Sequence, residues 1–145
     1  MSFGPIYIDH IGIAANHLDD NSDFWRLIGL KQGDDDEEVA DQGVITRFFS
    51  TSEMADIAPV PKVELLEPTG PDTPIGKFLE KRGPGVQQVC FSVGDLTGLL
   101  AHLSSHGVRL IDKVPRKGAG GKMIAFVHPA STGGVLVELS ERSSS

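Results

Sequence analysis

Hydrophobic and polar residues alternate along a segment close to the start of the chain. In residues 6–13, IYIDHIGI, the alternation places Ile11 and Ile13 on one face of an extended strand and His10 on the other. This pattern predicts a buried strand with a histidine at its centre. Residues 16–30 then carry apolar positions at helical spacing and predict a helix. Its expected apolar face consists of Phe24, Trp25, Leu27 and Ile28.

Polar and proline-rich segments separate the next elements. The acidic run at residues 34–38, DDDEE, lacks the alternating ligand spacing of an EF-hand calcium loop, so we expect a solvated loop there. Residues 44–50 and 61–67 have the pattern of strands, and residues 75–82 that of a short helix. The segment between the two strands, residues 51–61, is expected to be irregular.

The second half of the chain returns to the opening pattern. Residues 86–93, VQQVCFSV, predict a strand, and Asp95 is a suitable N-cap for the helix that follows. That helix carries leucines at helical spacing, which would cover one face of a sheet: Leu96, Leu99, Leu100 and Leu103. The expected remainder is a glycine-rich turn at 116–122, strands at 123–128 and 134–140, and a frayed end at 141–145.

The two halves superpose with constant offsets. Over the first strand and helix the offset is 78 residues, so His10 corresponds to Gln88 and Gly29 to Gly107. The closing strands correspond at an offset of 74, which places Glu64 on Glu138. The chain is therefore predicted to consist of two copies of one β-α-β-β-β unit.

A single copy would have one helix and would leave the second face of its sheet uncovered. Pairing two copies is the natural way to make a core and a shared concave surface. We therefore predict an α+β fold in which two tandem β-α-β-β-β modules form a cupped mixed sheet. The expected organisation is one domain over residues 1–145, with modules at about 6–68 and 86–140 and a linker with a short helix at 69–85.

Four polar residues lie opposite apolar sets on the predicted strands: His10, Glu64, Gln88 and Glu138. If the apolar sets face the helices, all four point into the cup. They would otherwise be the water-facing side of half-buried strands, which predicts scattered polar types. Each copy instead supplies one imidazole or amide and one carboxylate at equivalent places. Two neutral and two anionic donors suit a divalent ion, so we predict a metal site.

Composition narrows the classes of protein to consider. A chain of 145 residues with 39% hydrophobic and 23% charged residues is typical of a soluble domain with one core. The net charge of -7 argues against general nucleic-acid binding, which relies on cationic surface. Neither a signal peptide nor an apolar run of about 20 residues is evident, so we expect a cytoplasmic protein without a membrane span. The single cysteine, Cys90, is expected to be buried packing.

Several strings along the chain carry a family resemblance. They are IDHIGIA at residues 8–14, DQGV at 41–44, VELLEP at 63–68, TPIGKFLEKRG at 73–83, GVRLID at 107–112 and HPASTGGVLVEL at 128–139. Together they resemble the vicinal oxygen chelate superfamily, which includes glyoxalase I, extradiol dioxygenases and antibiotic-binding proteins. Within it, the chain is most similar to methylmalonyl-CoA epimerase. The resemblance implies a metal-dependent isomerase that acts on an acyl-CoA, and a homodimer.

The resemblance also assigns roles to individual residues. The metal ligands of the family map onto His10, Glu64 and Glu138, whereas Gln88 stands where the epimerases have a histidine. The ion would be divalent cobalt, manganese, nickel, zinc or magnesium. An amide oxygen is a poorer ligand than imidazole for borderline metals, so we expect weaker affinity or an altered metal preference. Some epimerases carry a carboxylate on the strand after the QGV turn, where this chain has Thr46.

Inversion of a carbon next to a thioester requires removal of its α-proton and return of a proton to the opposite face. A divalent ion would stabilise the enolate, and two bases would exchange the proton. Glu138 is the first candidate for a base and Glu64 the second. Two alternatives stay open. A glyoxalase-like isomerase or lyase would use the same site on another substrate, and a non-catalytic protein of the antibiotic-binding type would sequester a small molecule without metal.

A coenzyme A substrate also carries phosphate groups. Arg116, Lys117 and Lys122 surround the glycine-rich turn and are candidates to receive them. Their spacing is not that of a phosphate-binding loop, so a hairpin turn with solvated cations is the favoured interpretation.

Overall fold

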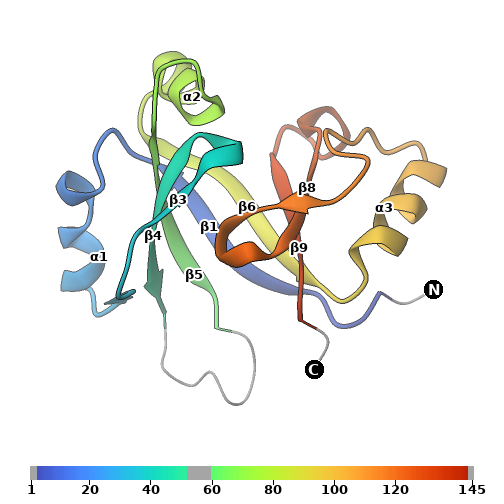
Figure 1. The fold of residues 1–145 in the computed structure, drawn as a ribbon, viewed down its shortest axis with the longest axis horizontal. Coiled ribbons are helices and arrows are strands. Elements are labelled where there is room, and N and C mark those ends of the chain that lie inside the picture. Colours follow the sequence, from blue (N-terminus) through green and yellow to red (C-terminus); the bar gives the residue numbers. More distant parts are fainter. Residues whose placement is uncertain (1–2, 52–59, 144–145) are drawn as a thin grey trace. The chain divides into compact units, whose positions relative to one another are not determined.

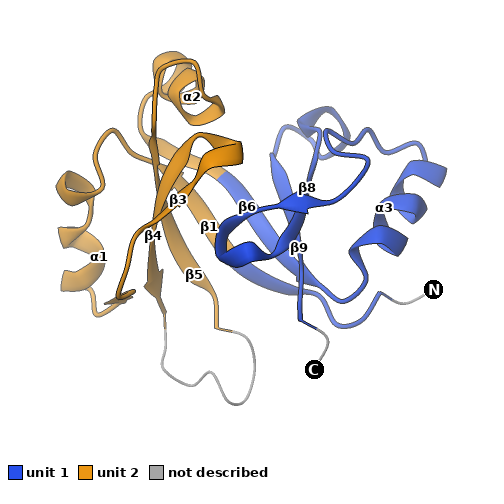
Figure 2. Ribbon diagram, in the orientation of Figure 1, with its two compact units in different colours: residues 1–9, 88–145 blue, residues 10–87 orange. Residues whose placement is uncertain are grey.

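The computed structural model describes residues 3–51 and 60–143. They belong to two compact units, one of residues 10–87 and one of residues 1–9 with 88–145 (Figure 2). Each unit contains one β-α-β-β-β module with additional short strands (Figure 1), so the predicted α+β class and tandem modules are confirmed. The segment expected to be irregular at 51–61 lies mostly outside the described residues.

The sheet of residues 10–87 has the strand order β2-β4-β5-β1, and β3 pairs with β4. Gly12 of β1, in parallel pairing, and Phe48 of β4, in antiparallel pairing, both lie opposite Glu64 of β5. The elements of this half are β1 (Tyr7–Ala14), η1 (Asp19–Asn21), α1 (Asp23–Leu27), β2 (Lys31–Gln32), β3 (Glu37–Val39), η2 (Ala40–Gln42), β4 (Val44–Ser50), β5 (Lys62–Pro68) and α2 (Pro74–Arg82).

The sheet of the other unit has the strand order β6-β9-β8-β7. Cys90 of β6, in parallel pairing, and Phe126 of β8, in antiparallel pairing, lie opposite Glu138 of β9. This register matches that around Glu64 at the offsets of 78 and 74, which confirms the repeat. The elements are β6 (Gly85–Val93), α3 (Leu96–Ser105), β7 (Arg116–Lys117), η3 (Ala119–Gly121), β8 (Met123–Val127), η4 (Pro129–Ser131) and β9 (Val137–Glu141).

The leucine face predicted for the second helix is confirmed. Leu96 and Leu100 of α3 are buried in a cluster with residues of β6, β8 and β9, and the remaining two leucines pack against it. The Asp95 side chain accepts a hydrogen bond from the Gly98 N–H at 3.0 Å, which is the expected N-cap. Among the described residues, no helix has the length and hydropathy needed to cross a membrane.

The prediction of one helix over residues 16–30 is wrong in its length and in the face that it expects to be buried. The segment forms the 3-10 turn η1 and then α1, which has only five residues. Between them the Ser22 hydroxyl donates to the Leu18 carbonyl at 2.6 Å, a local bond of the kind that competes with helical pairing. Of the expected apolar face, Trp25 packs on the core, whereas the other three residues are exposed, Leu27 by 85%.

The acidic run also differs from its prediction as a solvated loop. Its last residues begin β3, in which Glu37, Glu38 and Val39 pair with Thr46, Ile45 and Val44 of β4. Val39 is buried. This pairing uses the backbone N–H and C=O groups of β4. The charges of residues 34–38 give no indication that such a partner strand is available.

A carboxylate on each closing strand holds the start of a helical segment. The Leu18 N–H donates to Glu67 Oε1 and the Leu96 N–H donates to Glu141 Oε2, both at 2.9 Å. The four residues keep the two offsets of the repeat. Such a carboxylate satisfies a backbone N–H that has no partner within the helix and interacts favourably with the helix dipole.

The end of the chain is ordered further than the expected fraying at 141–145. Glu141 closes β9, and the Arg142 side chain donates to the carbonyls of Ser92 at 2.8 Å and Pro5 at 2.7 Å. Its guanidinium also lies over the Tyr7 ring, 5.3 Å from the centroid. Residues 144–145 lie outside the described part of the chain.

Arg47 of β4 links three segments on the face that packs against η1 and α1. Its guanidinium donates two hydrogen bonds to Asp36 at 2.8 Å, and one each to Asp19 and the Ser22 hydroxyl at 2.9 Å. Hydrogen bonding to Arg47 holds the pKa of the Asp36 carboxyl below its usual value of 3.8, although burial opposes this shift. The same hydrogen bonds raise the pKa of Arg47.

We expect Arg47→Met to lower the free energy of unfolding by about 1–2 kcal/mol at neutral pH, because it removes charge-assisted hydrogen bonds while keeping an aliphatic chain. Since the folded pKa of Asp36 is depressed, its stabilisation is present above about pH 4 and is lost as the pH falls through the folded pKa. Urea unfolding at pH 7 and in acid should therefore show the difference from wild type shrinking in acid. An undiminished difference would contradict the assignment. Arg26→Met, at a more exposed ion pair with Asp23, is the matched control.

Candidate functional site

His10 and Glu64 form a buried pair in the unit of residues 10–87. They come from the parallel neighbours β1 and β5 and lie on the same face, because Gly12, two residues after His10, is opposite Glu64. His10 Nε2 lies 3.4 Å from Glu64 Oε1. The imidazole also contacts the Phe48 ring edge-to-face, with the centroids 5.7 Å apart.

Gln88 and Glu138 form the equivalent pair in the other unit. Gln88 Nε2 donates a hydrogen bond to Glu138 Oε1 at 2.5 Å. The two residues come from the parallel neighbours β6 and β9, with Cys90 opposite Glu138, so the placement repeats that of the first pair. Because the amide NH2 donates to the carboxylate, the Gln88 carbonyl oxygen is the atom suited to binding a cation.

The faces of the strands match the prediction from sequence. All four residues are only 3–6% exposed. In residues 10–87, the core cluster under η1 and α1 contains Val63 and Leu65, the immediate neighbours of Glu64 in sequence. These neighbours point to the opposite face of β5 from Glu64.

The donor types in both pairs fit a divalent ion. Burying a carboxylate is costly unless it is paired, hydrogen-bonded or bound to a metal. Each pair contains one buried carboxylate together with an imidazole or an amide, and these donors suit zinc, cobalt, nickel, manganese or magnesium to different degrees. The structure brings His10 to Glu64 and Gln88 to Glu138. The assignment of all four to one ion stays a prediction.

Two of the three cations near the glycine-rich turn, Arg116 and Lys122, have carboxylate partners within their own unit. Arg116 Nε lies 3.3 Å from Asp112 Oδ1, and Lys122 Nζ lies 3.8 Å from Asp9 Oδ1. The turn connects β7 to β8 as a hairpin. These contacts favour the interpretation of a hairpin turn over that of a phosphate site.

Asp9, a residue that sequence reasoning passed over, lies beside Cys90 in the unit of residues 1–9 and 88–145. A carboxylate oxygen of Asp9 lies within 4.8 Å of Cys90 Sγ, and Cys90 is fully buried. The burial of Cys90 agrees with its expected packing role. No spacing in the sequence indicates the proximity of Asp9, because the two residues come from different strands of the repeat.

Comparison with known proteins gives the family. The model of the glyoxalase/bleomycin resistance protein/dioxygenase superfamily matches residues 9–126. An uncharacterized Bacillus subtilis protein, YqjC, is 42% identical over 135 residues, which covers 92% of this chain and 91% of that protein. The mitochondrial methylmalonyl-CoA epimerase of Dictyostelium discoideum is 33% identical over 136 residues, which covers 93% of this chain and 78% of that enzyme.

Solved structures agree with these sequence relatives. A variant of Streptomyces coelicolor methylmalonyl-CoA epimerase in complex with 2-nitronate-propionyl-CoA superposes with a TM-score of 0.87 at 35% identity. The superposition covers 95% of each chain. The chain therefore belongs to the glyoxalase/bleomycin resistance protein/dioxygenase superfamily and is a relative of the methylmalonyl-CoA epimerases.

Proposed function

We propose that the protein is a metal-dependent epimerase that inverts the α-carbon of methylmalonyl-CoA or a similar acyl-CoA. The observation that carries the proposal is the repeated buried pair, His10 with Glu64 and Gln88 with Glu138. Each pair supplies half of the proposed ligand set. The relationship to methylmalonyl-CoA epimerases supports the substrate class. A homodimer is part of the same proposal, and sedimentation of the purified protein tests it.

The proposed metal would be held by His10, Glu64, Gln88 and Glu138. It would supply Lewis-acid stabilisation of the negative charge that develops on the thioester oxygen. Glu138 is our first candidate for a base and Glu64 the second. A carboxylate oxygen would take the α-proton from one face of the substrate, and a second carboxyl group would supply a proton to the opposite face.

The decisive experiment follows the α-proton. The protein is reconstituted with each divalent ion in turn and incubated with one epimer of methylmalonyl-CoA in deuterated water. We expect deuterium at the α-carbon together with formation of the other epimer. Absence of both exchange and inversion with every ion would refute the proposed function.

Gln88→His is expected to raise the affinity for zinc or cobalt by about tenfold or more, because imidazole is a better ligand for borderline metals than an amide oxygen. Competition with a chelator measures the change. Gln87→His is the matched control, because residue 87 points to the other face of β6 and should not alter metal affinity. If the Gln88 and Gln87 variants behave alike, residue 88 is not a ligand.

One observation favours the non-catalytic alternative. The Gln88 amide donates to Glu138 at 2.5 Å, so the protein itself supplies a hydrogen bond to this buried carboxylate. A binding protein of the antibiotic-resistance type would need no more than this. If neither the wild-type protein nor Gln88→His retains a metal after purification and reconstitution, this alternative replaces the epimerase.

A further inference from the structure

The edge strand β3 places an acidic residue next to the buried pair of residues 10–87. In the antiparallel pairing of β3 with β4, Glu37 lies directly opposite Thr46. Side chains at directly opposite positions share a face, with their Cβ atoms about 4.5–5.5 Å apart. The Thr46 side chain is buried, and its hydroxyl donates a hydrogen bond to the backbone carbonyl of Glu37 at 3.4 Å.

The shared face is the one that carries His10 and Glu64. Alternation along β4 puts Thr46 and Phe48 on one face, and Phe48 lies opposite Glu64 of β5. The edge-to-face contact between Phe48 and His10 is on this face too. Among the described strand residues of this face in 10–87, the carboxylates are Glu37 and Glu64.

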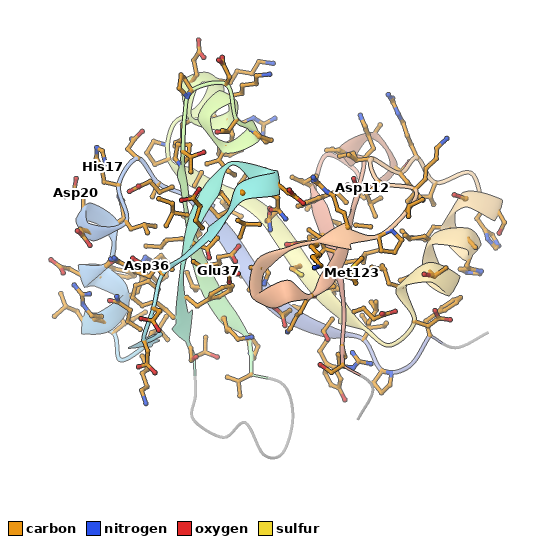
Figure 3. The ribbon with its side chains drawn as sticks, in the orientation of Figure 1. His17, Asp20, Asp36, Glu37, Asp112 and Met123 are labelled. Carbon is orange, nitrogen blue, oxygen red and sulfur yellow. The ribbon has the colours of Figure 1, made fainter. Side chains whose placement is uncertain are left out.

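The residue before Glu37 is held on the opposite side. Asp36 accepts two hydrogen bonds from Arg47, which points with Phe49 toward η1 and α1. Asp36 and Glu37 are both labelled in Figure 3. Because successive side chains of an extended segment alternate, anchoring Asp36 to Arg47 orients Glu37 toward the other face. Glu37 is half-buried there, whereas Glu38 is exposed.

The spacing suits a base that acts beside the metal ligands. One strand, β4, separates β3 from β5, so their backbones lie about 10 Å apart. The side chains of Glu37 and Glu64 therefore project on the same face from the two strands that flank β4. Glu64 is paired with His10, so Glu37 is the carboxylate of this face outside that pair.

From this placement we infer that Glu37 is a catalytic base of the epimerase, an inference that rests on the proposed function. One carboxylate takes the α-proton as the carbon–hydrogen bond breaks, and the electron pair stays on the thioester as an enolate. A second carboxyl group, protonated at the start, gives its proton to the opposite face, where the new carbon–hydrogen bond forms, and becomes a carboxylate. Glu37 performs one of these transfers and the base of the proposed function performs the other. After the product leaves, proton exchange with water returns both groups to their starting protonation states.

Glu37→Gln should lower the rate of inversion by about 100-fold to 10,000-fold. The two-base assignment makes a sharper prediction. In deuterated water, one epimer should still exchange its α-proton without inversion, because the remaining base can remove and return it, while exchange from the other epimer should be lost. A structural defect would slow exchange from both epimers alike. Metal content and affinity for 2-nitronate-propionyl-CoA should stay within a few-fold of wild type.

Two further variants complete the test. Glu38→Gln, on the opposite face of the same strand, is the matched control and should invert at the wild-type rate. Thr46→Glu in the Glu37→Gln background returns a carboxylate to the same face and should restore inversion by at least about tenfold.

The outcomes separate this inference from the proposed function. If the wild-type protein neither exchanges nor inverts, the proposed function fails. If the wild type inverts and Glu37→Gln inverts equally fast, or if Glu37→Gln slows exchange from both epimers equally, Glu37 is not a base and the epimerase assignment stands.

Discussion

Glu138→Ala is expected to lower the rate of acyl-CoA inversion by at least about 1000-fold and to release the divalent ion. In the proposed site, Glu138 is both a metal ligand and a base, so its removal takes away two contributions at once. The substitution also leaves the Gln88 amide without the carboxylate that accepts its hydrogen bond. An unsatisfied buried amide costs about 1–3 kcal/mol, so the variant should also be less stable.

Three measurements on Glu138→Ala separate the losses of activity, of metal binding and of stability. Inversion is followed by resolving the two epimers, metal content by elemental analysis, and stability by urea unfolding. Ser140→Ala is the matched control, because Ser140 is buried on the same strand and the same face but carries no charge. It should retain metal and most of the activity. A Glu138→Ala protein that keeps both metal and the wild-type rate would overturn the site.

Phe49→Ala is expected to lower the free energy of unfolding by about 3–5 kcal/mol, which is a large share of the stability of a small domain. Phe49 of β4 is fully buried against Leu18, Val63 and Leu65. Alanine would leave a cavity there and remove the dispersion contacts of the ring. Because Phe49 and Phe48 point to opposite faces of β4, the primary loss is in the core and not beside His10.

Urea unfolding of Phe49→Ala, followed by circular dichroism, measures the loss. Leu27→Ala is the matched control, since Leu27 is 85% exposed despite its helical position and should change stability by less than about 0.5 kcal/mol. Equal losses from the two substitutions would show that the packing described for β4 is not the source of stability. An unchanged free energy of unfolding for Phe49→Ala would also contradict this description of the packing.

Much of the fold is predictable from short-range patterns. The strand predicted at 44–50 is β4 with the same bounds, and Asp95 caps α3 as expected. These signals are local. Alternation of side chains, a capping carboxylate and leucines at helical spacing all operate within one or two turns of chain, so they can be recognised without knowledge of their neighbours.

The errors arise where distant segments decide the outcome. Residues 16–30 carry an apolar pattern, but the helix is interrupted at Ser22, whose hydroxyl accepts a hydrogen bond from Arg47, 25 positions away in the chain. The acidic run becomes β3 at Glu37 because the edge of β4 offers backbone partners to it. Glu141 and Arg142 are ordered by bonds to residues about 45–50 positions away in the chain. Intrinsic preference is weak, and such contacts override it.

The repeat can be recognised in the sequence alone. It also identifies the buried polar residues, which are His10, Glu64, Gln88 and Glu138. The reason is that a duplicated unit keeps its offsets, and the two-residue period of a strand shows which side chains share a face. Only the tertiary structure decided that His10 meets Glu64 and that Gln88 donates to Glu138, because the register between neighbouring strands is set by their pairing. The same pairing brought Glu37 opposite Thr46.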